Sequence, residues 1–89
     1  MLLASYTDNS IYKIMPNGQT QLYSKAPQLG GPIGLAFDSM DNLYVANYAK
    51  NNILKINKAG QVYTFMTKIT NPYYLIIKGN YMYITEQGN

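Results

Sequence analysis

The chain has 89 residues, of which 47% are hydrophobic and 12% are charged, so it holds at most one domain of ordinary size and is not a disordered segment. It has no Cys, which excludes disulfide bonds and thiolate metal sites. It also has no His, the commonest general base and a common zinc ligand, which removes the most frequent kinds of hydrolytic and metal centre.

The net charge of +3 comes from seven Lys residues that are spread along the chain, without any Arg. A nucleic-acid surface would concentrate its cations and favour Arg for bidentate contacts, so we expect solvated lysines and no specific nucleic-acid partner. The opening residues, Met1 to Leu3, have no basic segment before them and no long apolar run behind them, so neither a signal peptide nor a membrane span is expected. Localisation stays unknown, with the cytoplasm as the default.

The sequence repeats itself with a period of about 40 residues. At a shift of 42, residues 4–19 match residues 46–61, with Tyr6 on Tyr48 and Asn9 on Asn51 among the identical pairs. A second match starts at residue 32 with a shift of 40, and from residue 42 the shift is 38. The later copy has therefore lost two residues from the loop that corresponds to the segment between residues 37 and 42. Such a period is typical of solenoids and β-propellers.

The apolar runs within the repeat predict short strands and not helices. They are rich in β-branched and aromatic residues, are bounded by Asn, Gly and Lys, and show no helical apolar stripe. The complete repeat predicts antiparallel strands at residues 33–38, 42–48, 52–57 and 61–66. The fold class is therefore all-β, with β-propeller blades of four antiparallel strands and about two blades in the chain.

The chain then divides into three parts of a partial β-propeller. Residues 1–31 hold the last three strands of one blade and a connecting loop, residues 32–66 hold a complete blade, and residues 67–89 hold the first two strands of the next. Gly34 and Ala36 are small, which would let the inner strands of neighbouring blades approach each other. Packing between blades is expected at Leu35, Phe37, Val45, Ile53 and Ile56. Side-chain oxygens of Asp38 and Asn42 are expected to accept backbone N–H groups in the turn between them.

Three segments of the complete repeat, GLAFD at residues 34–38, NLYVAN at 42–47 and NNILKI at 51–56, resemble the NHL repeat. This resemblance implies propeller blades and leaves the function open. The turn at residues 15–18 and the ending at residues 83–89 are similar to the streptogramin lyase propellers, which implies a centre of His, Glu and a divalent metal. The run at residues 32–36 is similar to the gluconolactonase-like propellers, which implies calcium held by carboxylates and an Asn.

The residues that these enzymes use are missing from the chain. It has no His, Glu86 is its only Glu, and Ile33 and Tyr73 stand where the calcium-binding Asn would be. The four carboxylates show no spacing that would enforce acid and base geometry. We therefore expect a protein that is not an enzyme, with no catalytic residues, no metal and no cofactor.

A piece of about two blades leaves apolar faces open, because each blade packs between two neighbours. We expect either a homo-oligomer, with a trimer favoured, or further blades in a longer chain. Three copies would close a ring of roughly six blades. The ending at residues 81–89 would then be a surplus strand at each junction.

The connections between blades, and those between the second and third strand of a blade, are expected to lie on one end of the propeller. This end has the longer loops and is the better candidate for binding a protein or a glycan. The candidate binding residues are Tyr6, Asn47, Tyr48 and Glu86. Tyr and Asn repeated around a rim suit such ligands, although packing of the tyrosines against a neighbouring blade is an alternative. The function predicted is a non-catalytic binding or structural module. The alternative is a fragment of a longer metal-dependent lyase or lactonase propeller.

Overall fold

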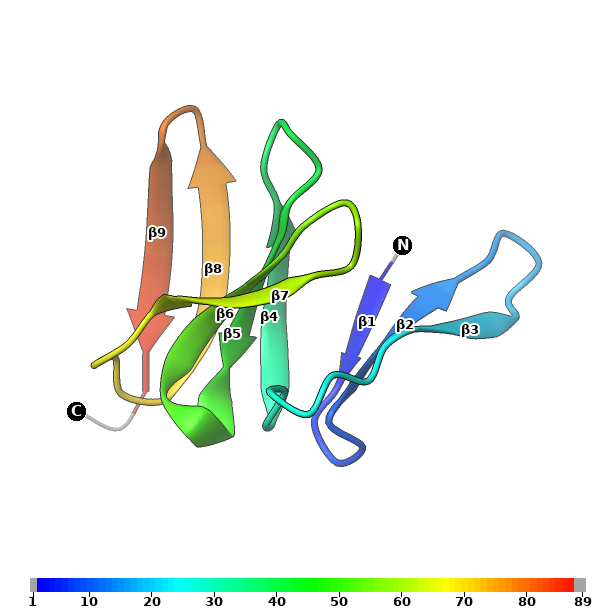
Figure 1. Cartoon of the computed structure of the whole chain (residues 1–89), viewed down its shortest axis with the longest axis horizontal. Coiled ribbons are helices and arrows are strands. Elements are labelled where there is room, and N and C mark those ends of the chain that lie inside the picture. The colour runs from blue at the N-terminus through cyan, green and yellow to red at the C-terminus, as the bar shows by residue number, and fades with distance from the viewer. Residues whose placement is uncertain (1, 88–89) are drawn as a thin grey trace.

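The computed structural model describes residues 2–87. In this part of the chain nine strands form three antiparallel sheets that stand side by side, and one short helical turn lies between two of the strands (Figure 1). The first blade has the strand order β1-β2-β3, the central blade β4-β5-β6-β7, and the third blade β8-β9. Their bounds are β1 Leu2–Ser5, β2 Ser10–Ile14, β3 Thr20–Ser24, β4 Pro32–Phe37, β5 Leu43–Asn47, η1 Tyr48–Lys50, β6 Asn52–Ile56, β7 Val62–Met66, β8 Pro72–Lys78 and β9 Tyr81–Glu86.

The predicted fold class is confirmed. The four strands expected for the complete repeat coincide with β4 to β7, and the incomplete blades contain the three and two strands expected of them. Met1, Gly88 and Asn89, the last two of which belong to the predicted surplus segment, lie outside the described residues. No helix in the described part of the chain is long and apolar enough to cross a membrane.

Two apolar clusters join the three blades. One lies between the first and central blades and the other between the central and third blades, so the central blade is buried on both sides. The first cluster consists of Ile11, Leu29, Leu43, Val45, Leu54 and Ile56, and the second of Tyr44, Ala46, Ile53, Ile69 and Leu75. Strand alternation explains this division, because successive side chains of β5 and β6 point to opposite faces of the sheet.

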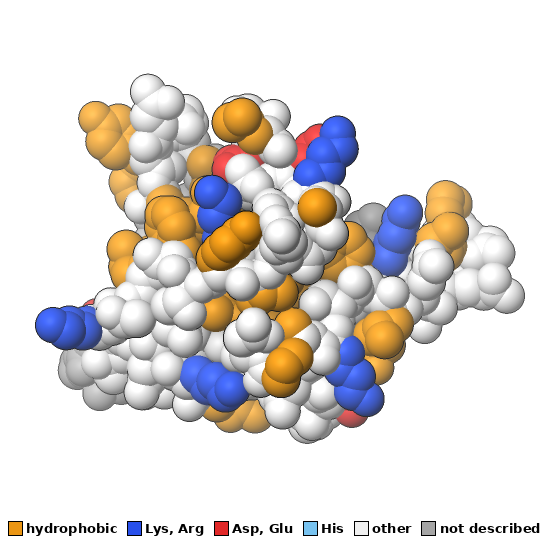
Figure 2. Space-filling view, in the orientation of Figure 1, with side chains coloured by type: hydrophobic (Ala, Val, Ile, Leu, Met, Phe, Trp, Pro, Cys, Tyr) orange, Lys and Arg blue, Asp and Glu red, His pale blue; other side chains and the backbone are white. Residues whose placement is uncertain are grey.

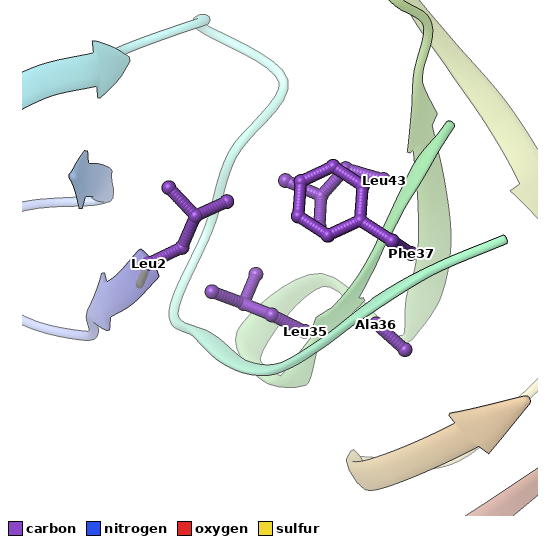
Figure 3. A pocket seen from close by; sticks show the side chains of 5 residues that line it. All are labelled: Leu2, Leu35, Ala36, Phe37 and Leu43. Atoms are coloured by element: carbon purple, nitrogen blue, oxygen red, sulfur yellow. The ribbon is translucent and has the colours of Figure 1, made fainter. Parts of the chain in front are cut away.

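The packing positions expected from the sequence are confirmed at Val45, Ile53 and Ile56, which are at most 1% exposed. The expectation was wrong for Phe37, which is 49% exposed. Phe37 and Leu35 point from β4 toward the first blade (Figure 3), and among residues 2–87 that blade has no strand equivalent to β4 that could cover them.

Gly34 has the predicted role. A Cβ atom at this position would lie 2.9 Å from the backbone oxygen of Tyr73 and 3.2 Å from the Cα atom of Tyr74. Real Cβ atoms essentially never come within 3.0 Å of such a backbone atom, so Gly34 is what allows β4 and β8 to pack backbone against backbone.

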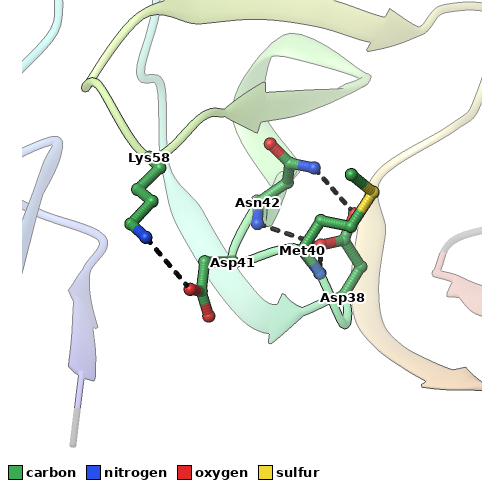
Figure 4. A network of polar contacts seen from close by, with 5 residues as sticks. All are labelled: Asp38, Met40, Asp41, Asn42 and Lys58. Atoms are coloured by element: carbon green, nitrogen blue, oxygen red, sulfur yellow. Dashed lines mark hydrogen bonds and ion pairs between the residues drawn. The ribbon is translucent and has the colours of Figure 1, made fainter.

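The turn between β4 and β5 is also built as expected (Figure 4). Oδ1 of Asp38 accepts the backbone N–H groups of Met40 and Asn42, and its Oδ2 accepts the Asn42 amide at 3.0 Å and the Tyr44 hydroxyl at 3.1 Å. These hydrogen bonds, that from the Asn42 side chain foremost, lower the pKa of Asp38 to about 2. The ion pair of Asp41 with Lys58 at 3.9 Å joins two exposed side chains and adds little stability.

The alignment of the last strand at a shift of 38 was wrong by one residue. Leu35 pairs with Val45 and Phe37 with Leu43, while Leu75 pairs with Ile84 and Ile77 with Met82. Met82 is therefore the equivalent of Leu43, at a shift of 39, and the turn between β8 and β9 is one residue shorter than its counterpart. Because side chains alternate, this slip exchanges the two faces of β9. Met82 and Ile84 pack toward the central blade, while Tyr81 and Tyr83 are 70% and 56% exposed.

Candidate binding face

Four connections lie at one end of the three blades, at the bottom of Figure 1, and we call this end the loop face. They are the connections β1–β2, β3–β4, β5–β6 and β7–β8, which span residues 6–9, 25–31, 48–51 and 67–71. The grouping of these loops agrees with the strand alternation expected from the sequence. Tight turns occupy the opposite end.

The loop face is held together by a hydrogen bond that recurs at the same repeat position. Asn9, in the first blade, accepts the backbone N–H of Gly31 at 2.8 Å, and Asn51, in the central blade, accepts that of Asn71 at 2.8 Å. Both Asn9 and Asn51 have positive φ, which Asn tolerates better than most residues. Each of these bonds joins one blade to the loop that enters the next. The step from one blade to the next is therefore built in the same way twice.

Three tyrosine rings, one from each blade, form a row on the loop face. The ring centroids of Tyr6 and Tyr48 are 6.0 Å apart with planes at 64°, and those of Tyr48 and Tyr73 are 6.5 Å apart with planes at 72°. Both are edge-to-face contacts, the geometry that aromatic pairs prefer. Tyr6 is 49% and Tyr73 48% exposed, while the central ring of Tyr48 is partly buried. We call Tyr6, Tyr48 and Tyr73 the tyrosine row.

The hydroxyl of Tyr48 donates a hydrogen bond to Oε1 of Gln87 at 2.7 Å, directly after β9. This bond links the central ring of the row to the end of β9. Half-exposed aromatic faces offer apolar contact to a ligand, and their hydroxyls add hydrogen bonds.

Of the predicted site residues, Asn47 lies below the surface. It is 0% exposed, and its Oδ1 accepts the Gly30 N–H at 2.7 Å. Its Nδ2 donates to the Gln28 carbonyl at 3.0 Å and to Oδ1 of Asn52 at 2.9 Å. These bonds fasten the loop before β4, so we assign Asn47 a structural role.

Glu86 lies at the edge of the loop face, at the end of β9 and opposite Pro72 in the register. Its Oε1 accepts the backbone N–H of Thr70 at 3.1 Å, which ties it to the loop before β8. The structure thus brings Tyr6 and Tyr48 together, and it places Glu86 near the start of β8, from which Tyr73 projects.

The sequence did not single out Tyr73 or Gln87 as site residues. Tyr73 matches Ile33 in the repeat, so comparison of the copies gives no sign of a third tyrosine. Gln87 matches Tyr48 only when the shift is 39, which is the register that the structure has.

The donor atoms present do not fit the metal centre that the lyase resemblance implies. Among residues 2–87, no group of three or more acidic, His or Cys side chains comes together. The chain has no His, and the Asp38 oxygens already accept hydrogen bonds within their own turn. Lysines are scattered singly over the face seen in Figure 2, without a basic patch.

No protein-family model matches the chain, and a search of curated proteins finds no match either. Among solved structures, the chain is similar to a catalytically inactive variant of virginiamycin B lyase from Staphylococcus aureus, solved with quinupristin. The TM-score is 0.64 and the identity 23%, over 79% of this chain and 25% of the lyase chain. The chain thus spans about a quarter of the length of the lyase that it matches. Because that lyase is a β-propeller, the likeness shows that the three blades have a propeller-like fold.

Proposed function

We propose that this chain supplies blades to a closed β-propeller that binds a protein or a glycan, without catalysis, through the tyrosine row. The observation that supports this proposal is the contact of Tyr6, Tyr48 and Tyr73, which come from three different blades and meet edge to face on one surface. A row that crosses blade boundaries suits an extended ligand that lies across the loop face.

The chemistry of the row favours ligands with flat apolar patches and hydroxyl or amide groups. A sugar ring can stack on an exposed tyrosine face, and a peptide can place an apolar side chain between two rings. Glu86, the acidic candidate residue, lies at the edge of the row and is tied to the loop before β8 through the Thr70 N–H. The blades themselves are of the NHL type in this proposal.

A second candidate function is a part of a longer, metal-dependent lyase-type propeller. The similarity to virginiamycin B lyase over a quarter of the lyase chain favours it. In that case the His and further Glu ligands would come from blades outside this sequence, and the present blades would be structural.

The proposal is tested by titrating the purified chain with a panel of oligosaccharides and of peptides that carry apolar side chains, with calorimetry as the readout. Tyr6→Ala and Tyr73→Ala should each raise the dissociation constant of the bound ligand by about tenfold, a loss of affinity typical of one aromatic contact. Tyr63→Ala is the matched control, because Tyr63 is also 49% exposed but lies on β7 outside the loop face. Equal losses in all three variants, or no ligand in the panel, would count against the tyrosine row. Turnover that depends on added Mg²⁺ in a longer chain that includes further blades, but not in the present chain, would favour the second candidate, because this sequence contains no His.

A further inference from the structure

Within residues 2–87, no strand of the first blade corresponds to β4. The sheet of this blade begins at β1, so the edge of β1 that faces away from β2 has no partner strand among residues 2–87. Next to this edge, between β1 and β4, lies an apolar groove of about 250 Å³ lined by Leu2, Leu35, Ala36, Phe37 and Leu43. In Figure 3, Leu2, Leu35, Phe37 and Leu43 point into the groove, while Ala36 points away toward β8.

The neighbouring blade shows what covers such a position. Leu75 on β8 is the repeat equivalent of Leu35, and it is 2% exposed because β4 and the central blade lie against it. Leu35 is only partly buried, and Phe37, the equivalent of the partly buried Ile77, is 49% exposed. The two side chains of β4 thus lack the inner strand against which β8 packs its own.

The shape of the missing strand follows from the repeated blade step. The hydrogen bonds of Asn9 and Asn51 join successive blades in the same way, so a strand added to β1 would approach β4 as β4 approaches β8. On β4 the residues that face β8 are Gly34 and Ala36, and a Cβ at Gly34 would already lie 2.9 Å from backbone. The missing strand must therefore present small residues at two alternate positions toward Leu35 and Phe37.

The β8 strand of a second copy does not meet this requirement. At the positions of Gly34 and Ala36 it carries Tyr74 and Ile76. The Tyr74 side chain would have to occupy the space of the β4 backbone. A ring closed by placing β8 of one copy beside β1 of the next is thus sterically disfavoured, although the strand count alone would allow it.

We propose that the groove takes an extended segment of the same repeat type as β4, with Gly and Ala at alternate positions toward β4 and large apolar residues between them. It adds to the free edge of β1 in antiparallel orientation through main-chain hydrogen bonds. The added strand would take on β1 the register that β4 has on β5. Its residues equivalent to Ala36, Leu35 and Pro32 would then lie opposite Leu2, Leu3 and Ser5, respectively. The source is a further blade and not the β8–β9 hairpin of another copy. This inference depends on the blade packing at the end opposite to the tyrosine row. It is therefore independent of whether the tyrosine row binds a protein or a glycan.

The test uses a synthetic peptide with the sequence of residues 32–38, flanked by lysines for solubility, which is titrated into the intact chain. Binding should be saturable and should slow hydrogen exchange of the β1 amides. The same peptide with Gly34→Tyr and Ala36→Ile should bind at least about tenfold more weakly, because its side chains meet the β4 backbone. A peptide of residues 72–78 should also fail to compete. Equal binding of all three peptides, or binding without protection of β1, would overturn the proposal.

A second measurement avoids dependence on peptide affinity. A copy of residues 32–42 is fused directly before Met1, which puts the added strand in the repeat register of the first blade. The extended chain should melt at least about 5 °C above the original, a shift that a modest gain in stability gives in a domain of this size. The extension with the Tyr and Ile substitutions should give no such rise. A trimer of the unmodified chain in which crosslinks join β8 of one copy to β1 of the next would refute the inference.

Discussion

Replacing Asn47 by Ala tests how much one buried side chain contributes to the ordering of the loop face. The side chain is 0% exposed, and its three hydrogen bonds hold the loop at residues 28–30 and Asn52. In Asn47→Ala the buried N–H of Gly30 loses its acceptor, and an unsatisfied buried group costs about 1–3 kcal/mol. The small void that remains adds about 1 kcal/mol. We expect a loss of about 2–4 kcal/mol in the free energy of unfolding.

Urea unfolding followed by far-UV circular dichroism measures this loss from the shift in midpoint at a constant slope. Asn57→Ala is the matched control, since Oδ1 of Asn57 also accepts two backbone N–H groups, those of Ala59 and Gln61. These two donors lie in an exposed turn where water replaces the lost acceptor, so the control should lose less than about 1 kcal/mol. The reasoning is refuted if both variants lose the same, because burial would then not decide the cost.

Two further predictions concern β4 and the turn that follows it. Gly34→Ala should destabilise the chain by about 1–3 kcal/mol, because β4 and β8 must separate to admit the new methyl group; an unchanged melting temperature would show that the two strands are not in backbone contact. The lowered pKa of Asp38 means that its hydrogen bonds stabilise the fold above the ordinary Asp pKa of 3.8 and that this stabilisation is lost as the pH falls through about 2. In Asp38→Asn the urea midpoint should depend less on pH between these two values than it does in the original chain. The same pH dependence in both proteins would contradict the stabilising role of the Asp38 carboxylate.

Most of the strand pattern could be predicted because its signals are local. Gly18 and Gly60 have φ of +88°, and each occupies the same place in a tight turn. The apolar runs between such turns are too short for helices and rich in strand-forming residues. The roles of Gly34 and of the turn at Asp38 also follow from local chemistry, since each depends on the size or the hydrogen-bonding capacity of one side chain.

The candidate site could be predicted only in part. The repeat of Tyr6 and Tyr48 identified two members of the tyrosine row, whereas their contact across the blade boundary is seen only in the structure. The burial of Asn47 could not be read from its polarity, because it depends on the loop before β4 folding over it. Tyr73 entered the row because β8 places it beside Tyr48, although it has no tyrosine counterpart in the repeat.

The sequence by itself determined the period, the number and order of the strands, and the need of the central blade for neighbours on both sides, because these depend on turn residues and apolar alternation along the chain. Only the tertiary structure decided the register of β9, which places Met82 and Ile84 inward and leaves Tyr83 outward. A difference of one residue in a hairpin turn exchanges the two faces of a strand, and the polarity of β9 alternates too weakly to reveal it. The requirements of the groove beside β1 were likewise decided only by the tertiary structure. Whether Tyr74 fits there depends on how closely two backbones approach, and that distance exists only in the folded chain.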